Sequence, residues 1–316
     1  MKKKIIIVGS DPNSINSEII SKVWGKINPS IRKKLYLIAN YNLINEQFKK
    51  IKSRTPIVKV KELNENSVLK KLKIINIPLN FKDPFKISLK NSKKYVIDSL
   101  DLAHKLAQKK EVKGLINCPL SKELLHRSKK IGVTEFLASK CKVNKETEVM
   151  LIHNKKFSVV PLTTHINIKD ISKKISKNLI IKKITTLDKS YKKLFNKKPK
   201  IGVLGLNPHN GEFRHNSEEF KIINPSILKL KKLGFTIYGP LSADTLFIND
   251  YKKYDVVVGM YHDQVLTPFK SLFHFNAINV TLGLNYIRVS PDHGPASELI
   301  GKNKAEISVF TGSRKS

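Results

Sequence analysis

The sequence predicts an α/β fold with helices covering parallel sheets. Short apolar runs alternate with amphipathic stretches along most of the chain, which is the pattern of strands joined by helices that pack on the sheet. A length of 316 residues fits two domains or one large α/β unit. Hydrophobic residues make up 40% of the chain and supply enough apolar surface for a packed interior, which argues against disorder throughout.

Two helices and three strands are predicted in the first half of the chain. The strands are the apolar runs at residues 4–8, 36–38 and 112–117. Residues 14–26 predict a helix that Ser14 or Ser17 caps. The helix at 91–110 is the clearest, because its apolar side chains recur on one face: Val96, Leu100, Ala103 and Ala107. The three prolines between residues 51 and 88 indicate short strands and loops there.

The second half continues the same alternation. Its predicted strands are residues 148–153, 157–163, 200–206, 254–260 and 277–282, the first two joined by a tight Asn-Lys-Lys turn. Its predicted helices are residues 169–196, with many lysines facing outward, and 217–233, which Gly234 ends. No internal repeat or low-complexity linker is visible, so ordered elements must cross any domain boundary.

The chain is strongly basic, with a formal net charge of +35 that would suit a polyanionic partner. Only six of the 60 basic residues are arginine, whereas nucleic-acid recognition depends on arginine forks and aromatic stacking platforms. The lysines are spread over every segment, which indicates a compositional bias on solvated faces. We therefore expect no specific nucleic-acid partner.

Cysteine content and hydropathy predict the compartment. Cys118 and Cys141 are too few for a disulfide framework in a protein of this size, which favours a reducing environment. The apolar run near the first residue is shorter than a signal-peptide core and stops at Ser10-Asp11-Pro12. No stretch approaches the ~18 apolar residues of a membrane span. We expect a cytoplasmic protein with no membrane association.

Three histidines share one structural position. His165, His209 and His262 each lie just past the carboxyl end of a predicted buried strand, the edge at which open α/β sheets bind ligands. A single such histidine is more often an ordinary loop residue. Because neutral imidazole is the commonest metal ligand and three imidazoles leave positions open for substrate, the three placements together predict a catalytic metal site.

Groups suited to an anionic substrate accompany these histidines. Lys270 follows His262 by eight residues, and Asn279 and Arg288 flank the last predicted strand and the loop after it. Arginine offers a planar fork that matches carboxylate or phosphate, and lysine offers a point charge. Asp244 lies in a Ser-Ala-Asp-Thr segment that suits either a functional carboxylate or an ordinary helix cap.

No Gly-x-Gly-x-x-Gly follows the first strand, and neither a P-loop nor a nucleophile elbow is present. The residues alone therefore indicate metal-assisted chemistry on a small anion and show no nicotinamide cofactor.

Six motifs extend this interpretation. They are LTTH at 162–165, GLNPHNGE at 205–212, GPLSADTLF at 239–247, MYHDQ at 260–264, NVTLG at 279–283 and DHG at 292–294. Together and in this order they resemble the 4-hydroxythreonine-4-phosphate dehydrogenase family of pyridoxal phosphate biosynthesis. The resemblance covers nearly the whole chain and is densest from residue 160 to 300.

The resemblance implies a homodimer whose chains each have two α/β/α domains with a cleft between them, as in isocitrate and isopropylmalate dehydrogenases. Residues 1–125 with 295–316 would form the first domain, and 126–294 the second domain with the metal and substrate site. The site would lie near the dimer interface. The cofactors implied are NAD or NADP, bound without the usual Gly-rich fingerprint, and a divalent metal such as zinc, magnesium or cobalt.

The resemblance also assigns roles to residues. The family's metal ligands fall on His165, His209 and His262, and its substrate contacts fall on four further residues: Thr134, Lys270, Asn279 and Arg288. We take Lys270 and Asp244 as the catalytic residues. No cofactor-binding residue is assigned.

The family reaction oxidises the C3 hydroxyl of 4-phosphooxy-L-threonine, and the product 2-amino-3-oxo-4-phosphooxybutanoate loses carbon dioxide to give 3-amino-2-oxopropyl phosphate. One departure leaves an alternative open, because Val133 stands where the family has a histidine. A related dehydrogenase of threonate or erythronate 4-phosphate is that alternative. A metal-dependent hydrolase using the same histidines is a third possibility.

Overall fold

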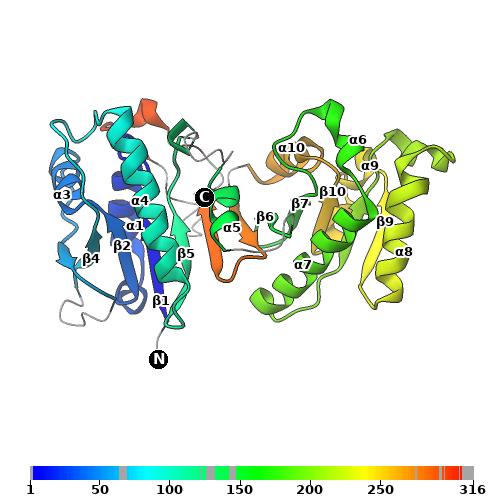
Figure 1. The fold of residues 1–316 in the computed structure, drawn as a ribbon, viewed down its shortest axis with the longest axis horizontal. Coiled ribbons are helices and arrows are strands. Elements are labelled where there is room, and N and C mark those ends of the chain that lie inside the picture. The colour runs from blue at the N-terminus through cyan, green and yellow to red at the C-terminus, as the bar shows by residue number, and fades with distance from the viewer. Residues whose placement is uncertain are drawn as a thin grey trace. The chain divides into compact units, whose positions relative to one another are not determined.

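The computed structural model describes residues 3–63, 70–121, 123–125, 132–141, 147–274, 276–291, 294, 296–305 and 307. The chain divides into a first unit, Met1–Cys141 with Asn285–Ser316, and a second unit, Lys142–Leu284. Each unit has its own strands with helices packed against them (Figure 1). The α/β fold class predicted from the alternation of apolar runs is therefore confirmed.

The first unit is built on parallel strands in the order β3–β4–β2–β1–β5–β12. Their bounds are β1 (Lys4–Val8), β2 (Leu35–Ala39), β3 (Ile57–Val60), β4 (Leu72–Asn76), β5 (Val112–Asn117) and β12 (Ile287–Pro291). The strand order reverses between β1 and β5. In open α/β sheets such a reversal opens a crevice at the carboxyl ends of the two strands, where ligands bind.

Helices cover both faces of the first unit's sheet. They are α1 (Asn16–Lys26), α2 (Pro29–Arg32), α3 (Tyr41–Lys50), α4 (Leu89–Ala107) and α5 (Val133–Lys140). On one face, Trp24 of α1 and Phe48 of α3 form a core with Leu37 of β2. Ile6 and Val8 are 0% exposed and point to the other face, since neighbouring strand residues alternate. There α4 contacts β1, β2 and β5.

The second unit has the strand order β11–β6–β7–β10–β8–β9. Its strands are β6 (Val149–His153), β7 (Ser158–Pro161), β8 (Ile201–Leu204), β9 (Ile237–Leu241), β10 (Val256–Gly259) and β11 (Ile278–Leu282). β6 is antiparallel to both of its neighbours, and its hairpin with β7 is the tight turn that the sequence predicts. The strands from β7 to β9 are parallel, so their carboxyl ends share one edge.

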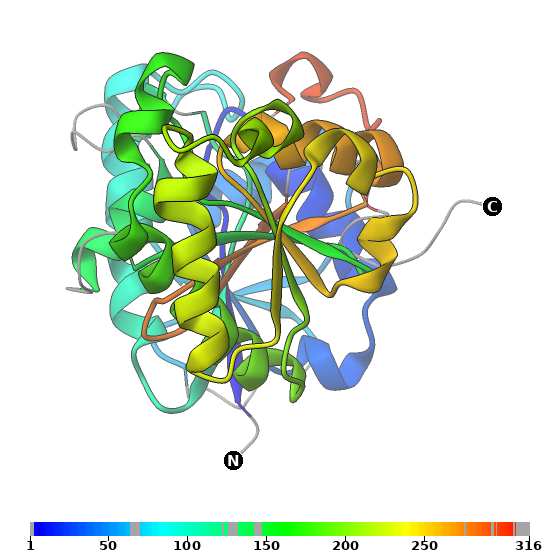
Figure 2. The same cartoon turned by 90° about the vertical axis from the view of Figure 1, so that its right-hand side faces the viewer.

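The second unit's helices also cover both faces. They are α6 (Ile171–Lys174), α7 (Lys177–Phe195), α8 (Asn224–Lys232), α9 (Ala243–Leu246) and α10 (His262–Phe273), with a π-helical turn at Glu219–Ile223 and short 3₁₀ turns at Ile168–Asp170 and Asp250–Lys253. Phe157 and Phe269 are central in the core beneath α10. Helix α7 contacts β6 and β11, and α8 contacts α7 and β9. Figure 2 shows α8 on one side of the strands and α9 on the other.

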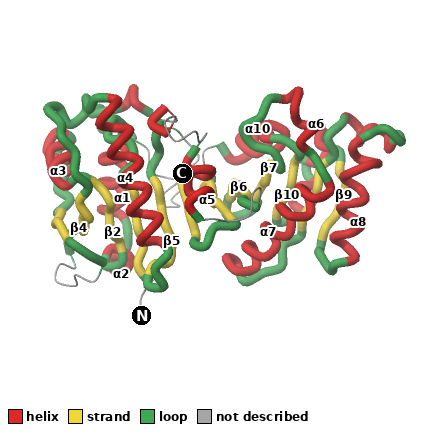
Figure 3. Tube along the Cα trace, viewed as in Figure 1, coloured by secondary structure: helices red, strands yellow, loops and turns green. Residues whose placement is uncertain are grey.

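Several elements differ from the sequence prediction (Figure 3). The helix predicted at 169–196 is broken at Ser176, which has an extended backbone. The Ser176 hydroxyl caps the following helix α7 by accepting a hydrogen bond from the Leu179 N–H at 3.2 Å. The elements that were not predicted include α2, α3, α5, α10, β9 and β12. β9 contains Gly239-Pro240, α10 contains Pro268 and β12 contains Arg288, and each interrupts the apolar pattern.

None of the helices in the described parts of the chain combines the length and the apolar character that crossing a membrane requires.

Candidate active site

Two of the predicted metal ligands lie side by side in the second unit. His165 follows β7 and His262 follows β10, and these strands are parallel neighbours with Pro161 opposite Gly259. Beyond the strands, the Leu162 N–H donates to the Gly259 carbonyl at 2.8 Å and the Thr163 hydroxyl donates to the Met260 carbonyl at 2.8 Å. The two extensions are thereby held together, and the imidazole centroids are 5.9 Å apart.

This spacing suits a shared cation. Zn–N bonds of about 2.0–2.1 Å put a ring centroid roughly 3 Å from the ion, so two imidazoles on one tetrahedral ion have centroids about 5 Å apart, within about 1 Å of the spacing of His165 and His262. Nδ1 of His262 lies 2.6 Å from Oδ1 of Asp263, a contact that orients the ring and makes Nε2 the nitrogen that could ligate an ion. A carboxylate on the second ring nitrogen is the usual support of a ligating histidine.

The third predicted ligand, His209, lies beyond β8 in the turn Pro208–Phe213 and is exposed. β8 pairs with β10, so the turn leaves the same edge of the sheet as the two other histidines. Within the described part of one chain, however, no three His, Cys, Asp or Glu side chains are grouped closely enough to hold a metal ion. The structure thus brings the rings of His165 and His262 near each other and forms no metal-holding trio with His209 among the described residues of one chain.

Asp244 belongs to α9, which lies beside the turn that carries His209. The Asn210 side-chain amide donates to the Pro240 carbonyl at 3.3 Å and to the Ser242 hydroxyl at 3.5 Å. Ser242 occupies the N-cap position of α9, but its side chain makes no capping hydrogen bond there. The Ser-Ala-Asp-Thr segment is therefore not held by the ordinary cap that the sequence also allowed.

Lys270 and Asn279 occupy two further elements of the second unit. Lys270 is half-buried on α10, about 12 Å from His262 along the helix axis. Asn279 lies on β11 opposite Ile152. Its Oδ1 is buried and has no hydrogen-bond partner among the described residues. Since buried polar atoms are nearly always paired, this oxygen is a candidate acceptor for a bound ligand.

In the first unit, two predicted substrate residues from distant parts of the chain meet. Arg288 on β12 donates from Nε to Oδ1 of Asn117 at 2.6 Å and from one terminal nitrogen to Oγ1 of Thr134 at 3.2 Å. The guanidinium group is 3% exposed. Burial lowers the pKa of Arg288 to about 10, and the nearby carboxylate of Glu135 opposes that shift. The group is still cationic at neutral pH and is suited to an anion.

Asn117, which holds Arg288, was not predicted as a functional residue. It ends β5, and its position at the end of an apolar run just before Cys118-Pro119 was the available signal. Val133, where the resembling family has a histidine, is 9% exposed and packs in the interior at the start of α5. His293 of the DHG motif lies outside the described residues.

The carboxyl ends of β1 and β5 are joined by side chains. Asn16 donates from Nδ2 to the Gly9 carbonyl at 2.9 Å and to the Pro119 carbonyl at 2.8 Å. Asp11 accepts from the backbone N–H of Asn13 and of Ser121. Burial raises the pKa of the Asp11 carboxyl, and these two hydrogen bonds oppose the shift. Polar side chains therefore take the place of a Gly-rich loop in this crevice.

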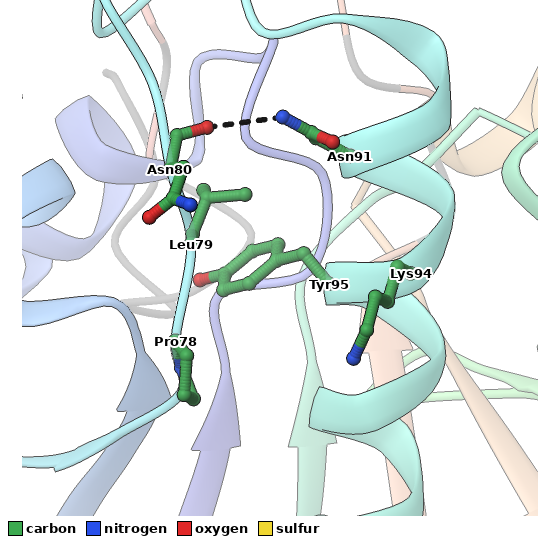
Figure 4. Close-up of a pocket in the computed structure, with 6 residues that line it drawn as sticks. All are labelled: Pro78, Leu79, Asn80, Asn91, Lys94 and Tyr95. Carbon is green, nitrogen blue, oxygen red and sulfur yellow. Dashed lines mark hydrogen bonds between the residues drawn. The ribbon is translucent and has the colours of Figure 1, made fainter.

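A small pocket of about 190 Å³ lies elsewhere in the first unit (Figure 4). It is lined by Pro78, Leu79, Asn80, Asn91, Lys94 and Tyr95. The Asn91 amide donates to the Asn80 carbonyl at 3.2 Å across it, and Lys94 pairs with Asp98. No predicted site residue lines this pocket, and it is smaller than the roughly 300 Å³ from which ligand pockets usually start.

Comparison with known proteins adds an independent observation. The family model described as "Pyridoxal phosphate biosynthetic protein PdxA" matches residues 31–313. A 4-hydroxythreonine-4-phosphate dehydrogenase of Sulfurihydrogenibium sp. is 37% identical over 313 residues, which cover 96% of this chain and 94% of that protein. A D-threonate 4-phosphate dehydrogenase of Pectobacterium atrosepticum is 36% identical over 205 residues, 64% of this chain.

Among solved structures, the 4-hydroxythreonine-4-phosphate dehydrogenase of Klebsiella pneumoniae superposes with a TM-score of 0.85 at 27% identity. The superposition covers 98% of this chain and 96% of that one.

Proposed function

The chain belongs to the family of the pyridoxal phosphate biosynthetic protein PdxA, and we propose that it catalyses the NAD-dependent oxidation of 4-phosphooxy-L-threonine. The product, 2-amino-3-oxo-4-phosphooxybutanoate, then loses carbon dioxide to give 3-amino-2-oxopropyl phosphate. The observation that carries the proposal is the pair His165 and His262, 5.9 Å apart at neighbouring strand ends in a chain that matches the family over nearly its whole length.

The donor set fits a divalent cation, for which we propose zinc, magnesium or cobalt. His165 and His262 would hold it through their imidazoles, with Asp263 fixing the second ring. His209 is the proposed third ligand. Because it is not grouped with the other two in one chain, we propose a homodimer in which a second copy helps to complete the set near the interface. When bound, the cation would ease deprotonation of the substrate hydroxyl.

We propose that the chain's charged groups bind and orient the substrate. Arg288, held by Asn117 and Thr134, would bind an anionic group through its planar fork. Asn279 would accept a hydrogen bond at its unpaired Oδ1. Lys270 would supply a second cation, and the carboxylate of Asp244 would hold a proton during the reaction. Fixed charges of this kind stabilise a transition state because they need no reorganisation.

For NAD or NADP we propose the crevice at the carboxyl ends of β1 and β5. The strand order reverses there, and Asn16 Oδ1 is a buried acceptor with no partner among the described residues. A nicotinamide cofactor bound there would supply the hydride acceptor. We also propose a cytoplasmic location, because Cys118 and Cys141 are both free thiols.

The test is product identification after incubation with 4-phosphooxy-L-threonine, NAD and one divalent metal. We expect NADH and 3-amino-2-oxopropyl phosphate, with none formed when NAD is omitted. Phosphate release without NAD would indicate a hydrolase and would contradict the proposal.

His209→Ala tests the metal site directly. We expect the variant to lose bound metal and turnover while keeping its fold, as judged by elemental analysis and circular dichroism. His215→Ala, which removes an exposed imidazole from the same loop region, is the matched control and should keep both. A metal-replete and active His209→Ala variant would remove this residue from the site.

A second candidate is oxidation of D-threonate 4-phosphate or erythronate 4-phosphate. Two observations favour it: the similarity to the Pectobacterium atrosepticum enzyme and the buried aliphatic Val133. Comparison of kcat/KM for the two acids and for 4-phosphooxy-L-threonine separates the candidates. A higher value for either acid would replace the leading assignment.

A further inference from the structure

The carboxyl group of Glu219 lies inside the loop that carries His209. Its side chain is 0% exposed. Oε1 accepts hydrogen bonds from the backbone N–H of Leu206 at 2.7 Å and of Asn207 at 2.8 Å, and Oε2 accepts one from the Asn207 side-chain amide at 2.9 Å. We propose that Glu219 is a positioning residue that fixes this loop and, through the loop, the imidazole of His209.

The backbone of the loop needs such a contact. His209, Asn210, Glu212 and Phe213 all have left-handed conformations with φ between 50° and 57°. Outside glycine this conformation costs about 1–2 kcal/mol per residue, because Cβ comes too close to the following carbonyl oxygen. Consecutive strained residues persist only where surrounding contacts hold them. The three hydrogen bonds to Glu219 fix the backbone immediately before the strained residues.

Two glycines let the loop wrap around this carboxyl group. A Cβ on Gly205 would lie 3.0 Å from Glu219 Oε1 and 2.2 Å from Asn210 Oδ1. A Cβ on Gly211, which has φ of +57°, would lie 3.1 Å from Glu219 Oε2 and 2.9 Å from Ser217 Cβ. Bare backbone therefore faces both carboxyl oxygens. Gly205 and Gly211, which stand before and after His209 in the sequence, therefore both lie against the carboxyl group of Glu219.

The helix that supplies Glu219 is also irregular at this point. Glu219 begins a π-helical turn, closed by the Asn224 N–H donating to the Glu219 carbonyl. Such single wide turns are rare and occur frequently at functional sites. Here the turn is confined to Glu219–Ile223 and gives way to the regular helix α8. The carboxyl group that holds the loop is thus anchored on a packed element.

The effect that we expect on metal affinity rests on the proposed function, whereas the positioning of His209 by Glu219 does not depend on it. Glu219→Gln keeps the volume of the side chain but replaces one carboxyl oxygen by an NH₂ group. In the wild-type protein both oxygens accept hydrogen bonds from Leu206 or Asn207, and an NH₂ group cannot accept them. We expect the loop to shift and the metal affinity to fall by about 10–100-fold, the range typical for losing a group that orients a ligand.

The experiment compares the full-length protein with Glu219→Gln, Asn207→Ala and Asp188→Asn. Asn207→Ala removes the side-chain bond to Glu219 Oε2 together with a bond to Glu218 Oε2 at 2.7 Å, keeps both backbone bonds to Glu219 Oε1, and is the milder variant. Asp188→Asn is the control, because it removes the charge of a 4% exposed carboxylate on α7 whose ion-pair partner is Lys192 of the same helix and not a residue of the loop. The readouts are Co²⁺ or Zn²⁺ affinity by titration and the His209 imidazole resonance in metal-free, ¹³C-histidine-labelled protein, assigned with His209→Ala.

A moved or broadened His209 resonance in Glu219→Gln or Asn207→Ala, with the Asp188→Asn spectrum unchanged, supports the positioning role. An unchanged resonance in both loop variants overturns it. If Glu219→Gln does not fold, Asn207→Ala alone decides. If the resonance moves but the wild-type protein binds no metal, the positioning role stands and the proposed metal site fails.

Discussion

Replacing Arg288 by Lys tests the polar core of the first unit. Among its contacts with described residues, the guanidinium group donates diverging hydrogen bonds from its planar fork to Asn117 Oδ1 at 2.6 Å and to Thr134 Oγ1 at 3.2 Å. A lysine ammonium on a flexible stem cannot reproduce that fork. At 3% exposed, the site does not let water replace the lost bond.

The magnitude follows from these contacts. A hydrogen bond to a charged group contributes about 1.5–3 kcal/mol, and an acceptor left buried without a partner costs about 1–3 kcal/mol. Lysine keeps one of the two contacts at best. We therefore expect Arg288→Lys to lower the free energy of unfolding of the first unit by about 2–4 kcal/mol.

Urea unfolding followed by tryptophan fluorescence measures this change in the relevant unit. Trp24 is the only tryptophan of the chain and lies 5% exposed in the first unit's core. The matched control is Arg54→Lys, the same chemical change at an exposed position of the same unit, which should stay within about 0.5 kcal/mol of wild type. An Arg288→Lys value equal to this control would refute the reasoning.

Two further predictions concern the core and the pH dependence of stability. Phe157→Ala should lower the free energy of unfolding by about 3–5 kcal/mol, because Phe157 is 3% exposed and its ring lies 5.0 Å from that of Tyr251; an unchanged melting temperature would contradict this. Burial lowers the pKa of His104 below its ordinary 6.5, so the unfolded chain binds the proton more readily and stability is lost as the pH falls below about 6.5. His104→Gln should make stability depend less on pH, as measured by urea unfolding at several pH values. The pH dependence that remains should come from His153, whose pKa is also lowered by burial. Curves of equal slope for His104→Gln and wild type would exclude His104 as a cause.

The positions of two candidate site residues could be predicted from the sequence, because each directly follows a local apolar run. His165 and His262 follow apolar runs that could only be buried strands, and parallel strands place their carboxyl ends at one edge. Their meeting at 5.9 Å follows from this rule once the two strands are neighbours. The partners of Arg288 could not be predicted this way, because Thr134 lies 154 residues away in the sequence.

The sequence alone determined the alternation of strands and helices, the family, and the position of a histidine just past three apolar runs, because each of these is written in a local pattern of residues. The tertiary structure alone decided which strands are neighbours, that Glu219 and Arg288 are buried on polar partners, and that the rings of His165 and His262 lie 5.9 Å apart. The physical reason is that long-range packing decides which residues are buried and which are close together. A charged residue can be buried only when partners from distant parts of the chain surround it, so its local sequence does not reveal its burial.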